Sequence, residues 1–238
     1  MEERAFLEQL ASYMDFSCVQ AQNTKEDIRR MLDAAEQFHP AAVFSLPCYT
    51  PYLAACLRKM KDATVRLGGV VGFPSGAQST AVKCLEAREL LALGCRELDM
   101  VLAVGKLKDG DIDYVREDIR SIVELAGAVP VKVIVEAGYL TDEELTLACR
   151  TAVQANADFV KTGTGWSGIP STVEMVQKMK QAVGNTAKVK AAGGVRTLDT
   201  VLRMYEAGCE RFGIGTDSAL KILQEAKQRL ERLEAEKI

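Results

Sequence analysis

The chain has 238 residues, 48% of them hydrophobic and 26% charged, with a formal net charge of -3 at pH 7, which is the composition of a globular protein with enough apolar residues for a large core. Basic residues are spread along the chain without forming a block, so nucleic acid is not an expected partner. No apolar run is long enough to cross a membrane, and the acidic N-terminus, MEERAFLEQLA, has the features of neither a signal peptide nor a transit peptide.

The cysteine and histidine content restricts the chemistry further. There are seven cysteines, an odd number, and no two of them form a CxxC pair. They lie mostly in apolar segments, which is typical of reduced core thiols in a cytosolic protein, so we expect a cytoplasmic location. His39 is the only histidine, which leaves almost no room for Ser-His, Cys-His or His-rich metal sites. We therefore expect no bound metal and no other cofactor.

Short β-branched or apolar runs alternate with longer amphipathic runs along the whole chain. A short helix is expected before the first strand. The expected strands are residues 13–18, 41–46, 66–72, 97–103, 131–136, 159–162, 187–191 and 211–215. The expected helices are residues 24–38, 50–61, 79–93, 111–126, 141–154, 171–183, 197–207 and 217–235.

Local signals support several of these boundaries. Gly94 and Gly208 each follow an expected helix and precede an expected strand, where a left-handed residue commonly ends a helix. Two helices begin with the spacing of a capping box, at Thr141 with Glu144 and at Ser171 with Glu174.

Eight strand-helix units without a Pro/Ser-rich linker leave two architectures, a closed (β/α)8 barrel and an open doubly wound sheet. The number of units and their even spacing favour the barrel, which typically needs about 250 residues. We therefore predict an α/β protein, a (β/α)8 TIM barrel, that forms a single domain over residues 1–238 with a short N-terminal helix.

Two lysines stand at the polar ends of apolar strands, where barrels carry their chemistry. They are Lys161 in ADFVKTGTGW and Lys190 in AKVKAAGGVR. Taken alone, either lysine is more often a surface residue or half of an ion pair. Two on adjacent strands, with Asp99 across the barrel, predict that one ammonium group disfavours protonation of the other. A neutral lysine amine is a nucleophile for carbonyl carbons.

Glycine-containing loops follow the last two strands. They could be simple turns between strand and helix. However, Gly193, Gly194 and Val195 lead directly to Arg196 and to an expected helix start at Thr197, so backbone N–H groups and the helix dipole could bind a phosphate. Barrels often build a phosphate site from the loops after strands seven and eight, and the loop FGIGTD would close the other side of it.

Six segments closely resemble the deoxyribose-phosphate aldolase family, in the family's order and spacing over nearly the whole chain. They are GFPSGAQSTAVKCLEA (72–87), ELDMVLAVG (97–105), KVIVEAGYLTDEE (132–144), ADFVKTGTGW (157–166), VKAAGGVRT (189–197) and RFGIGT (211–216). The resemblance implies a class I aldolase on a (β/α)8 barrel that needs no metal. Such an enzyme reversibly cleaves 2-deoxy-D-ribose 5-phosphate to D-glyceraldehyde 3-phosphate and acetaldehyde, so the implied partners are a small sugar phosphate and an aldehyde.

The resemblance also implies roles for individual residues. Lys161 matches the Schiff-base lysine, Lys190 the second lysine that lowers its pKa, and Asp99 the acid/base group acting with a water. Positions matching the family's substrate-binding residues are Asp15, Ser17, Gly165, Gly193, Gly194, Val195, Arg196, Gly213, Gly215 and Thr216.

The departures from the family lie in the loops that bind phosphate. Trp166 stands where members commonly have Lys or Phe, Ala192 replaces a common serine, and Gly215 and Thr216 stand where a serine pair is usual. Fewer hydroxyl donors weaken the side-chain contacts to phosphate while backbone donors remain, which predicts weaker or altered phosphate selection. A large indole could instead shorten the pocket and favour a smaller or unphosphorylated aldehyde.

Three alternatives stay open. The chain could be a related Schiff-base aldolase with a different or unphosphorylated aldehyde substrate, a non-catalytic sugar-phosphate-binding barrel, or a phosphate-binding barrel isomerase. Both lysines and the aspartate are present, which speaks against the second alternative, and an isomerase needs no second lysine. Barrels of this family often pair through their outer helices, so a homodimer is one assembly open to the chain.

Overall fold

Eight parallel strands close into a barrel in which each strand pairs with its neighbours in chain order and β8 pairs with β1. The computed structural model describes residues 2–60 and 64–235. The strands are β1 (Met14–Cys18), β2 (Ala42–Ser45), β3 (Arg66–Val71), β4 (Glu97–Val101), β5 (Val131–Ile134), β6 (Phe159–Lys161), β7 (Lys188–Ala192) and β8 (Arg211–Gly215). The predicted (β/α)8 barrel is confirmed.

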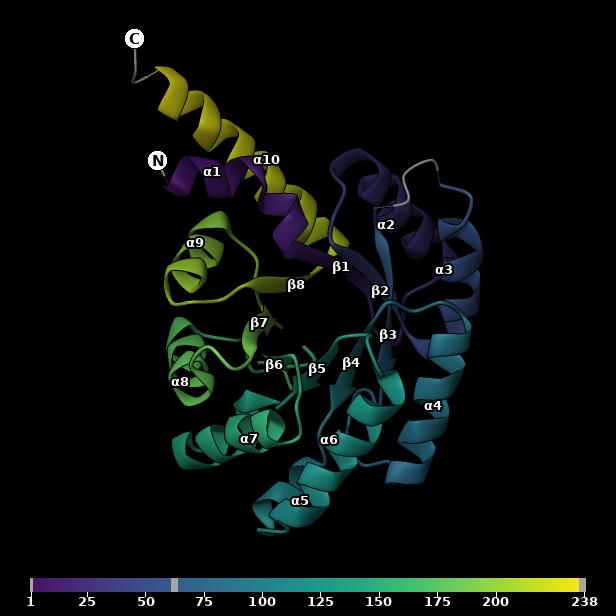
Figure 1. The fold of residues 1–238 in the computed structure, drawn as a ribbon. Coiled ribbons are helices and arrows are strands. Elements are labelled where there is room, and N and C mark those ends of the chain that lie inside the picture. The colour runs from purple at the N-terminus through teal and green to yellow at the C-terminus, as the bar shows by residue number, and fades with distance from the viewer. Residues whose placement is uncertain (1, 61–63, 236–238) are drawn as a thin grey trace.

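Helices surround this barrel on its outside (Figure 1). They are α1 (Glu2–Glu8), α2 (Lys25–Phe38), α3 (Thr50–Leu57), α4 (Thr80–Ala92), α5 (Val104–Lys108), α6 (Ile112–Ala126), α7 (Asp142–Gln154), α8 (Val173–Val183), α9 (Leu198–Glu206) and α10 (Thr216–Ala235). Short 3-10 helices lie at Leu10–Tyr13, Pro47–Tyr49 and Ala137–Tyr139. Among the described residues, every helix is too short or too polar to span a lipid bilayer.

The predicted elements agree closely with the observed ones. Each predicted strand limit differs from the observed limit by at most two residues. The predicted helix 50–61 ends earlier, at Leu57, and residue 61 lies outside the described residues. The short helix α5 was not predicted.

Capping side chains explain several helix starts. The capping box predicted at Thr141 is confirmed, because the Glu144 amide donates to its hydroxyl and its own amide donates to the Glu144 carboxylate. The box predicted at Ser171 is wrong. The N-cap of α8 is Thr172, and the Ser171 hydroxyl instead donates to the carbonyl of Ala192, at 2.6 Å. Gly94 and Gly208 adopt the predicted left-handed conformation, with φ of 98° and 95°.

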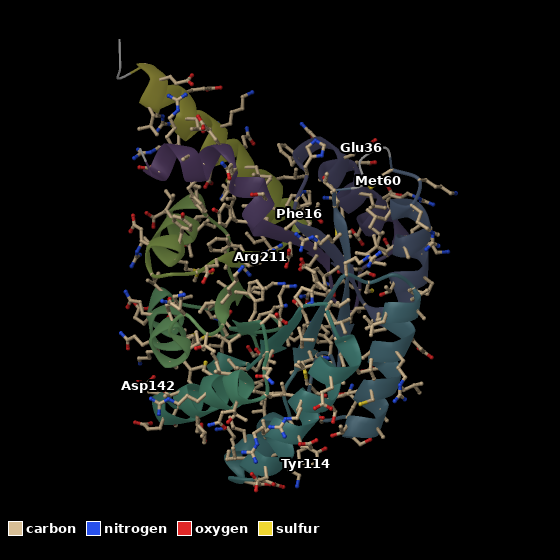
Figure 2. The ribbon with its side chains drawn as sticks, in the orientation of Figure 1. Phe16, Glu36, Met60, Tyr114, Asp142 and Arg211 are labelled. Atoms are coloured by element: carbon tan, nitrogen blue, oxygen red, sulfur yellow. The ribbon has the colours of Figure 1, made fainter. Side chains whose placement is uncertain are left out.

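Successive side chains along each strand point alternately outward, toward the helices, and inward, into the barrel. Outward-facing residues such as Met14, Phe16 and Val43 pack against the helices and form the main hydrophobic core. Inward-facing residues include a smaller apolar cluster around Phe44 and a group of charged side chains. Figure 2 shows Arg211 projecting into the centre of the barrel, whereas Tyr114 and Asp142 lie on outer helices.

Candidate active site

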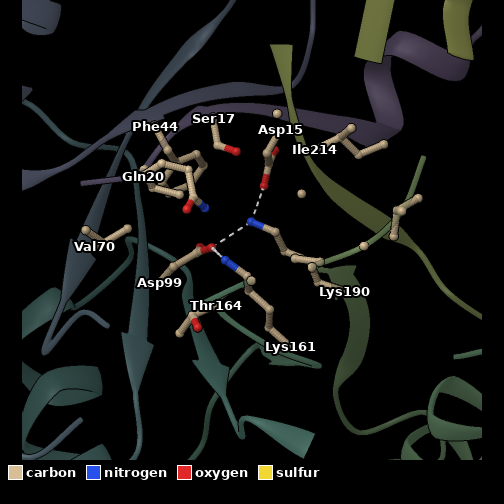
Figure 3. Close-up of a pocket in the computed structure, with 18 of the residues that line it drawn as sticks. Asp15, Ser17, Gln20, Phe44, Val70, Asp99, Lys161, Thr164, Lys190 and Ile214 are labelled. Atoms are coloured by element: carbon tan, nitrogen blue, oxygen red, sulfur yellow. Dashed lines mark hydrogen bonds and ion pairs between the residues drawn. The ribbon is translucent and has the colours of Figure 1, made fainter. Parts of the chain in front are cut away.

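Two lysine side chains meet on one carboxylate inside the barrel. Lys161 and Lys190 are register partners on β6 and β7, so their side chains project in the same direction. The Nζ of Lys161 and the Nζ of Lys190 both donate to Oδ2 of Asp99, at 2.8 and 2.6 Å (Figure 3). The predicted proximity of the two lysines and the aspartate is therefore observed.

Asp15 of β1 holds the second lysine from the other side. Its Oδ2 accepts from the Nζ of Lys190, at 2.6 Å, and its Oδ1 accepts from the guanidinium of Arg211, at 2.8 Å. Asp15 is completely buried, and its carboxylate is satisfied by two cations. Lys190 is thus fixed between two carboxylates, which limits the positions its ammonium group can take.

A further buried lysine completes the network and was missed by sequence reasoning. Lys132 of β5 donates to Oδ1 of Asp99, at 3.0 Å, and also to the carboxylate of Glu97. Glu97 and Asp99 are two residues apart on β4 and therefore share its inward face. That spacing was the available signal, because two acidic side chains on the inner face of a barrel strand require cations nearby.

The environment of Lys161 favours its neutral form. Burial is the main cause and lowers the pKa of Lys161 to about 8. The Asp99 carboxylate opposes this shift, whereas the ammonium groups of Lys190 and Lys132 add to it. The sequence predicted the contribution of the second lysine, but desolvation is the larger effect.

The carboxylates of Asp99 and Asp15 remain ionised. Burial alone would raise the pKa of Asp99, but the cations of Lys132, Lys161 and Lys190 hold that pKa well below its usual value. The pKa of Asp15 is lowered in the same way, against burial, chiefly by Lys190. Near neutral pH the site therefore combines a proton-accepting carboxylate with an amine that can lose its proton.

A cavity of about 340 Å³ opens above these groups at the C-terminal ends of the strands. It is lined by every residue predicted for the site except Thr216. The predicted residues that line it are Asp15, Ser17, Asp99, Lys161, Gly165, Lys190, Gly193, Gly194, Val195, Arg196, Gly213 and Gly215. The chemistry-bearing residues and the glycine loops thus share one cavity.

Thr216, which was predicted to bind substrate, does not line this cavity. Thr216 is the first residue of helix α10. Its side chain is buried, and its Oγ1 lies 3.8 Å from Sγ of Cys18. Ser218, two residues further along α10, lines the cavity. Asp217 is well exposed and pairs with Arg30, so its charge points away from an anion in the cavity.

The loop after β7 packs closely on the loop after β6. Gly193 and Gly194 both have positive φ, 89° and 83°, which a residue with a side chain adopts only with strain. A Cβ at Gly194 would lie 2.6 Å from Cβ of Pro170, and the amide of Ser171 donates to the Gly193 carbonyl, at 2.9 Å. Glycine is therefore required here by both conformation and space.

Trp166 does not shorten the cavity, which corrects one expectation from the sequence. Its indole N–H donates to the carbonyl of Val19, at 2.8 Å, and its ring packs edge-on against Phe73, with centroids 6.1 Å apart. The indole is partly exposed and is absent from the cavity lining. Trp166 therefore links the loop after β6 to the loops after β1 and β3.

Several other lining residues carried no signal in the sequence. Phe44, Val70 and Phe73 line the cavity, but apolar residues in apolar strands look like ordinary core. Glu136, which does not itself line the cavity, is in the sequence only the last residue of the expected strand 131–136. It adopts a left-handed conformation with φ of 51°, and its carboxylate accepts from the amide of Thr164, at 3.2 Å, which fixes the start of the loop after β6.

A lysine amine buried at the mouth of a (β/α)8 barrel, beside a carboxylate and a second ammonium group, is suited to an enzyme that bonds covalently to carbonyl compounds. The comparisons with known proteins agree with this class. The family model for DeoC/LacD family aldolases matches residues 10–225. The chain belongs to that family.

Individual relatives are similar over nearly their full length. The deoxyribose-phosphate aldolase of Thermococcus gammatolerans is 46% identical and covers 92% of this chain and 96% of its own. The deoxyribose-phosphate aldolase of Klebsiella pneumoniae is 41% identical, and the match covers 93% of this chain and 89% of that protein. Among solved structures, the deoxyribose phosphate aldolase of Aeropyrum pernix is 30% identical, with a TM-score of 0.83. The match covers 94% of this chain and 97% of that chain.

Proposed function

We propose that this chain is a class I aldolase that reversibly cleaves 2-deoxy-D-ribose 5-phosphate to D-glyceraldehyde 3-phosphate and acetaldehyde through a lysine Schiff base. The observation that carries the proposal is the buried amine of Lys161, whose pKa is lowered to about 8 beside Asp99. The relatives named deoxyribose-phosphate aldolase support the choice of substrate.

Lys161 begins the reaction as the nucleophile. Its neutral amine adds to the C1 carbonyl of the open-chain sugar, and loss of water gives an iminium ion that can accept an electron pair from the neighbouring carbon. A protonated amine has no free electron pair for this step. The lowered pKa of Lys161 therefore increases the fraction of this reactive form at neutral pH.

Asp99, through a water and the neighbouring Lys190, removes the proton of the C3 hydroxyl. Asp99 stays ionised, because nearby cations lower its pKa, and acting with a water it accepts the proton of the C3 hydroxyl. The C2–C3 bond then breaks, its electrons pass to the iminium, and the phosphorylated aldehyde leaves. The remaining enamine takes a proton at C2, and hydrolysis of the new iminium releases acetaldehyde and the free amine.

The glycine loops after β7 and β8 bind the phosphate in this proposal. Gly193, Gly194, Gly213 and Gly215 line the cavity and offer backbone approach without side chains in the way. Arg196 is the cation that lines the cavity outside the lysine pair, among the described residues. Ser17 and Asp15 lie on β1, on the side where a sugar hydroxyl would pass.

The proposal also includes the extent of the catalytic domain, its location in the cell and its assembly. We treat residues 1–238 as one catalytic domain that acts in the cytoplasm, which suits its free cysteines, and that takes part in a homodimer. The relative from Aeropyrum pernix is described as a tetramer, so assembly is to be measured by sedimentation.

Borohydride trapping tests the nucleophile directly. The protein is incubated with acetaldehyde, reduced, digested and mapped by mass spectrometry. We expect a reduced adduct on Lys161 and none in Lys161→Ala. An adduct that persists in Lys161→Ala would refute the assignment. Lys180→Ala is the matched control, because Lys180 lies on α8 and pairs with Glu210, away from the cavity.

A second assay tests the substrate. Cleavage of 2-deoxyribose 5-phosphate is compared with cleavage of free 2-deoxyribose in the same coupled assay. A preference for the phosphate ester is expected from the glycine loops and Arg196. A preference for the free sugar would favour the alternative that the loops select an unphosphorylated aldehyde, since Trp166, Ala192 and Gly215 stand where the family commonly has lysine or serine donors.

A further inference from the structure

We propose that Phe44 sets the size of the carbonyl donor that this site accepts, so that acetaldehyde fits and larger donors do not. This inference rests on the function proposed above. Phe44 belongs to an apolar cluster with Ala42, Val70, Phe73, Val101 and Ile134, which fills the side of the barrel interior formed by β2 to β5. In Figure 3, Phe44 and Val70 lie on one side of Asp99, and Lys190 lies on the opposite side of Asp99.

Phe44 lies across the barrel from the reacting amine. In a closed barrel of eight strands, strands four apart face each other, so β2 is opposite β6 and β3 is opposite β7. Phe44 on β2 therefore faces Lys161 on β6, and both line the same cavity. The phosphate loops follow β7 and β8, so Phe44 lies away from them.

The ring of Phe44 is held in place from two sides. Phe44 is 2% exposed. A Cβ at Gly68 on β3 would lie 2.2 Å from its Cζ, so glycine is needed to leave room for the ring. The ammonium groups of Lys190 and Lys132 lie 4.6 and 5.1 Å from the ring centroid, within the range of a cation-π contact. The ring is thus a fixed wall.

This wall lies beside the donor half of the substrate. In the iminium, carbon C1 is bonded to Nζ of Lys161 and C2 is attached to C1, and the other half of the substrate extends toward the loops after β7 and β8. An extra carbon on C1 or C2 points away from those loops, toward Phe44 and Val70. The close packing around the ring leaves it no room to move aside, so acetone and propanal are excluded by size.

Competitive trapping measures this selection. Protein is incubated with equal acetaldehyde and propanal and reduced with borohydride, and the ratio of ethyl to propyl adducts on Lys161 is read by mass spectrometry. The amine adds to each aldehyde, water leaves, and hydride reduces the iminium, so both adducts form by the same step. In Phe44→Ala the ratio should shift toward propyl by about tenfold, which is typical of one methylene group in a shaped pocket.

Phe159→Leu is the matched control. The Phe159 ring also lies near Lys132, 5.8 Å from its Nζ, but Phe159 does not line the cavity, so the wild-type ratio is expected. Phe44→Leu provides a smaller change that keeps an apolar side chain, and it should shift the ratio in the same direction whether or not Phe44→Ala folds.

The outcomes separate this inference from the proposed function. Absence of any adduct in the wild-type protein would overturn the proposed aldolase and this inference with it. A wild-type adduct with acetaldehyde, combined with an unchanged ratio in folded Phe44→Leu, would overturn only the role of Phe44. Equal trapping of propanal and acetaldehyde by the wild-type protein would overturn it without any variant.

Discussion

The amine of Lys161 determines how activity depends on pH. Its pKa is lowered to about 8 by burial, and only its neutral form attacks a carbonyl, so kcat/KM should rise as the pH rises through about 8. Asp99 keeps a depressed pKa and stays ionised throughout. The profile of kcat/KM, which reports the free enzyme, checks this. A profile that falls over the same range would contradict it.

Removing the ammonium group of Lys190 should raise the pH at which half of the Lys161 amine is neutral. In Lys190→Met the amine of Lys161 loses a cation that lowers its pKa, so the midpoint of borohydride trapping should shift to higher pH. Trapping is the better readout here, because the variant also loses a group proposed to move protons. Arg196→Gln is the control, since Arg196 lines the cavity without contributing to that shift, and its midpoint should match the wild type.

Gly68 and Phe44 should show strongly coupled stabilities. Gly68→Ala places a Cβ 2.2 Å from the Phe44 ring, and such overpacking costs about 1–3 kcal/mol. In a Phe44→Leu background the same change should cost much less, because the ring is gone. Urea unfolding of the two single variants and the double variant gives the coupling energy. If Gly68→Ala lowers the free energy of unfolding equally in both backgrounds, the added methyl group is accommodated by a shift of strand β3 and does not press on the Phe44 ring.

Part of the site was predictable from residues alone. Lys161, Lys190 and Asp99 stand out because charged residues in apolar strands must find partners inside the protein. Phe44 does not stand out, because an apolar residue in an apolar strand fits either face. The direction of Trp166 was also hidden, since it depends on a hydrogen bond to Val19, which is distant in the sequence.

At the scale of elements, a buried ion pair joins helices α4 and α6 to the strand that carries Asp99. The Nζ of Lys83 donates to Oδ2 of Asp118, at 2.6 Å, and to the carbonyl of Val101, at 3.0 Å. The hydroxyl of Thr80 donates to the other oxygen of Asp118, at 2.8 Å. Both charged side chains are completely buried, and Val101 is the last residue of β4.

Breaking this pair should be costly. Lys83→Met leaves the Asp118 carboxylate buried without its cation, and such losses are about 3–5 kcal/mol. Replacing both partners, in Lys83→Met/Asp118→Leu, should recover much of that stability. Urea unfolding measures each variant. Lys106→Met, which breaks an exposed pair with Asp111, is the control and should change little. A double variant no more stable than Lys83→Met would contradict the argument.

Element limits were largely predictable, and the errors have local causes. The strands and long helices follow from the alternation of apolar and polar residues. The helix α5 is only five residues long, too short to show a period. The start of α8 was misplaced because Ser171 and Thr172 can both cap a helix, and the Ser171 hydroxyl is used by the carbonyl of Ala192, which only the folded barrel brings near.

At the scale of the whole molecule, the first and the last helix pack together. Helix α1 lies against α10 (Figure 1), and the ring of Phe6 stacks on Tyr205 of α9, with centroids 3.8 Å apart. Phe6 also meets Tyr13 edge-on, at 5.0 Å, and is almost fully buried. The first helix thus covers apolar surface on α9 and on the 3-10 helix Leu10–Tyr13.

Phe6 should therefore stabilise the closed barrel. Phe6→Ala is expected to lower the free energy of unfolding by about 3–5 kcal/mol, as measured by urea unfolding. Arg4→Ala is the control, because its pairs with Glu8 and Glu234 are exposed and contribute little. Similar losses in both variants would show that the charges, rather than the ring, attach α1.

The depth of the cavity imposes an order on the reaction. Lys161 is 7% exposed, whereas Gly194, Arg196 and Gly215 are exposed at the rim. A substrate whose phosphate rests on those rim residues occupies the route between the amine and solvent. In cleavage the three-carbon product must depart first, and in synthesis the two-carbon aldehyde must arrive first. Product-inhibition kinetics should accordingly show an ordered sequence, with acetaldehyde as the last molecule out and the first one in.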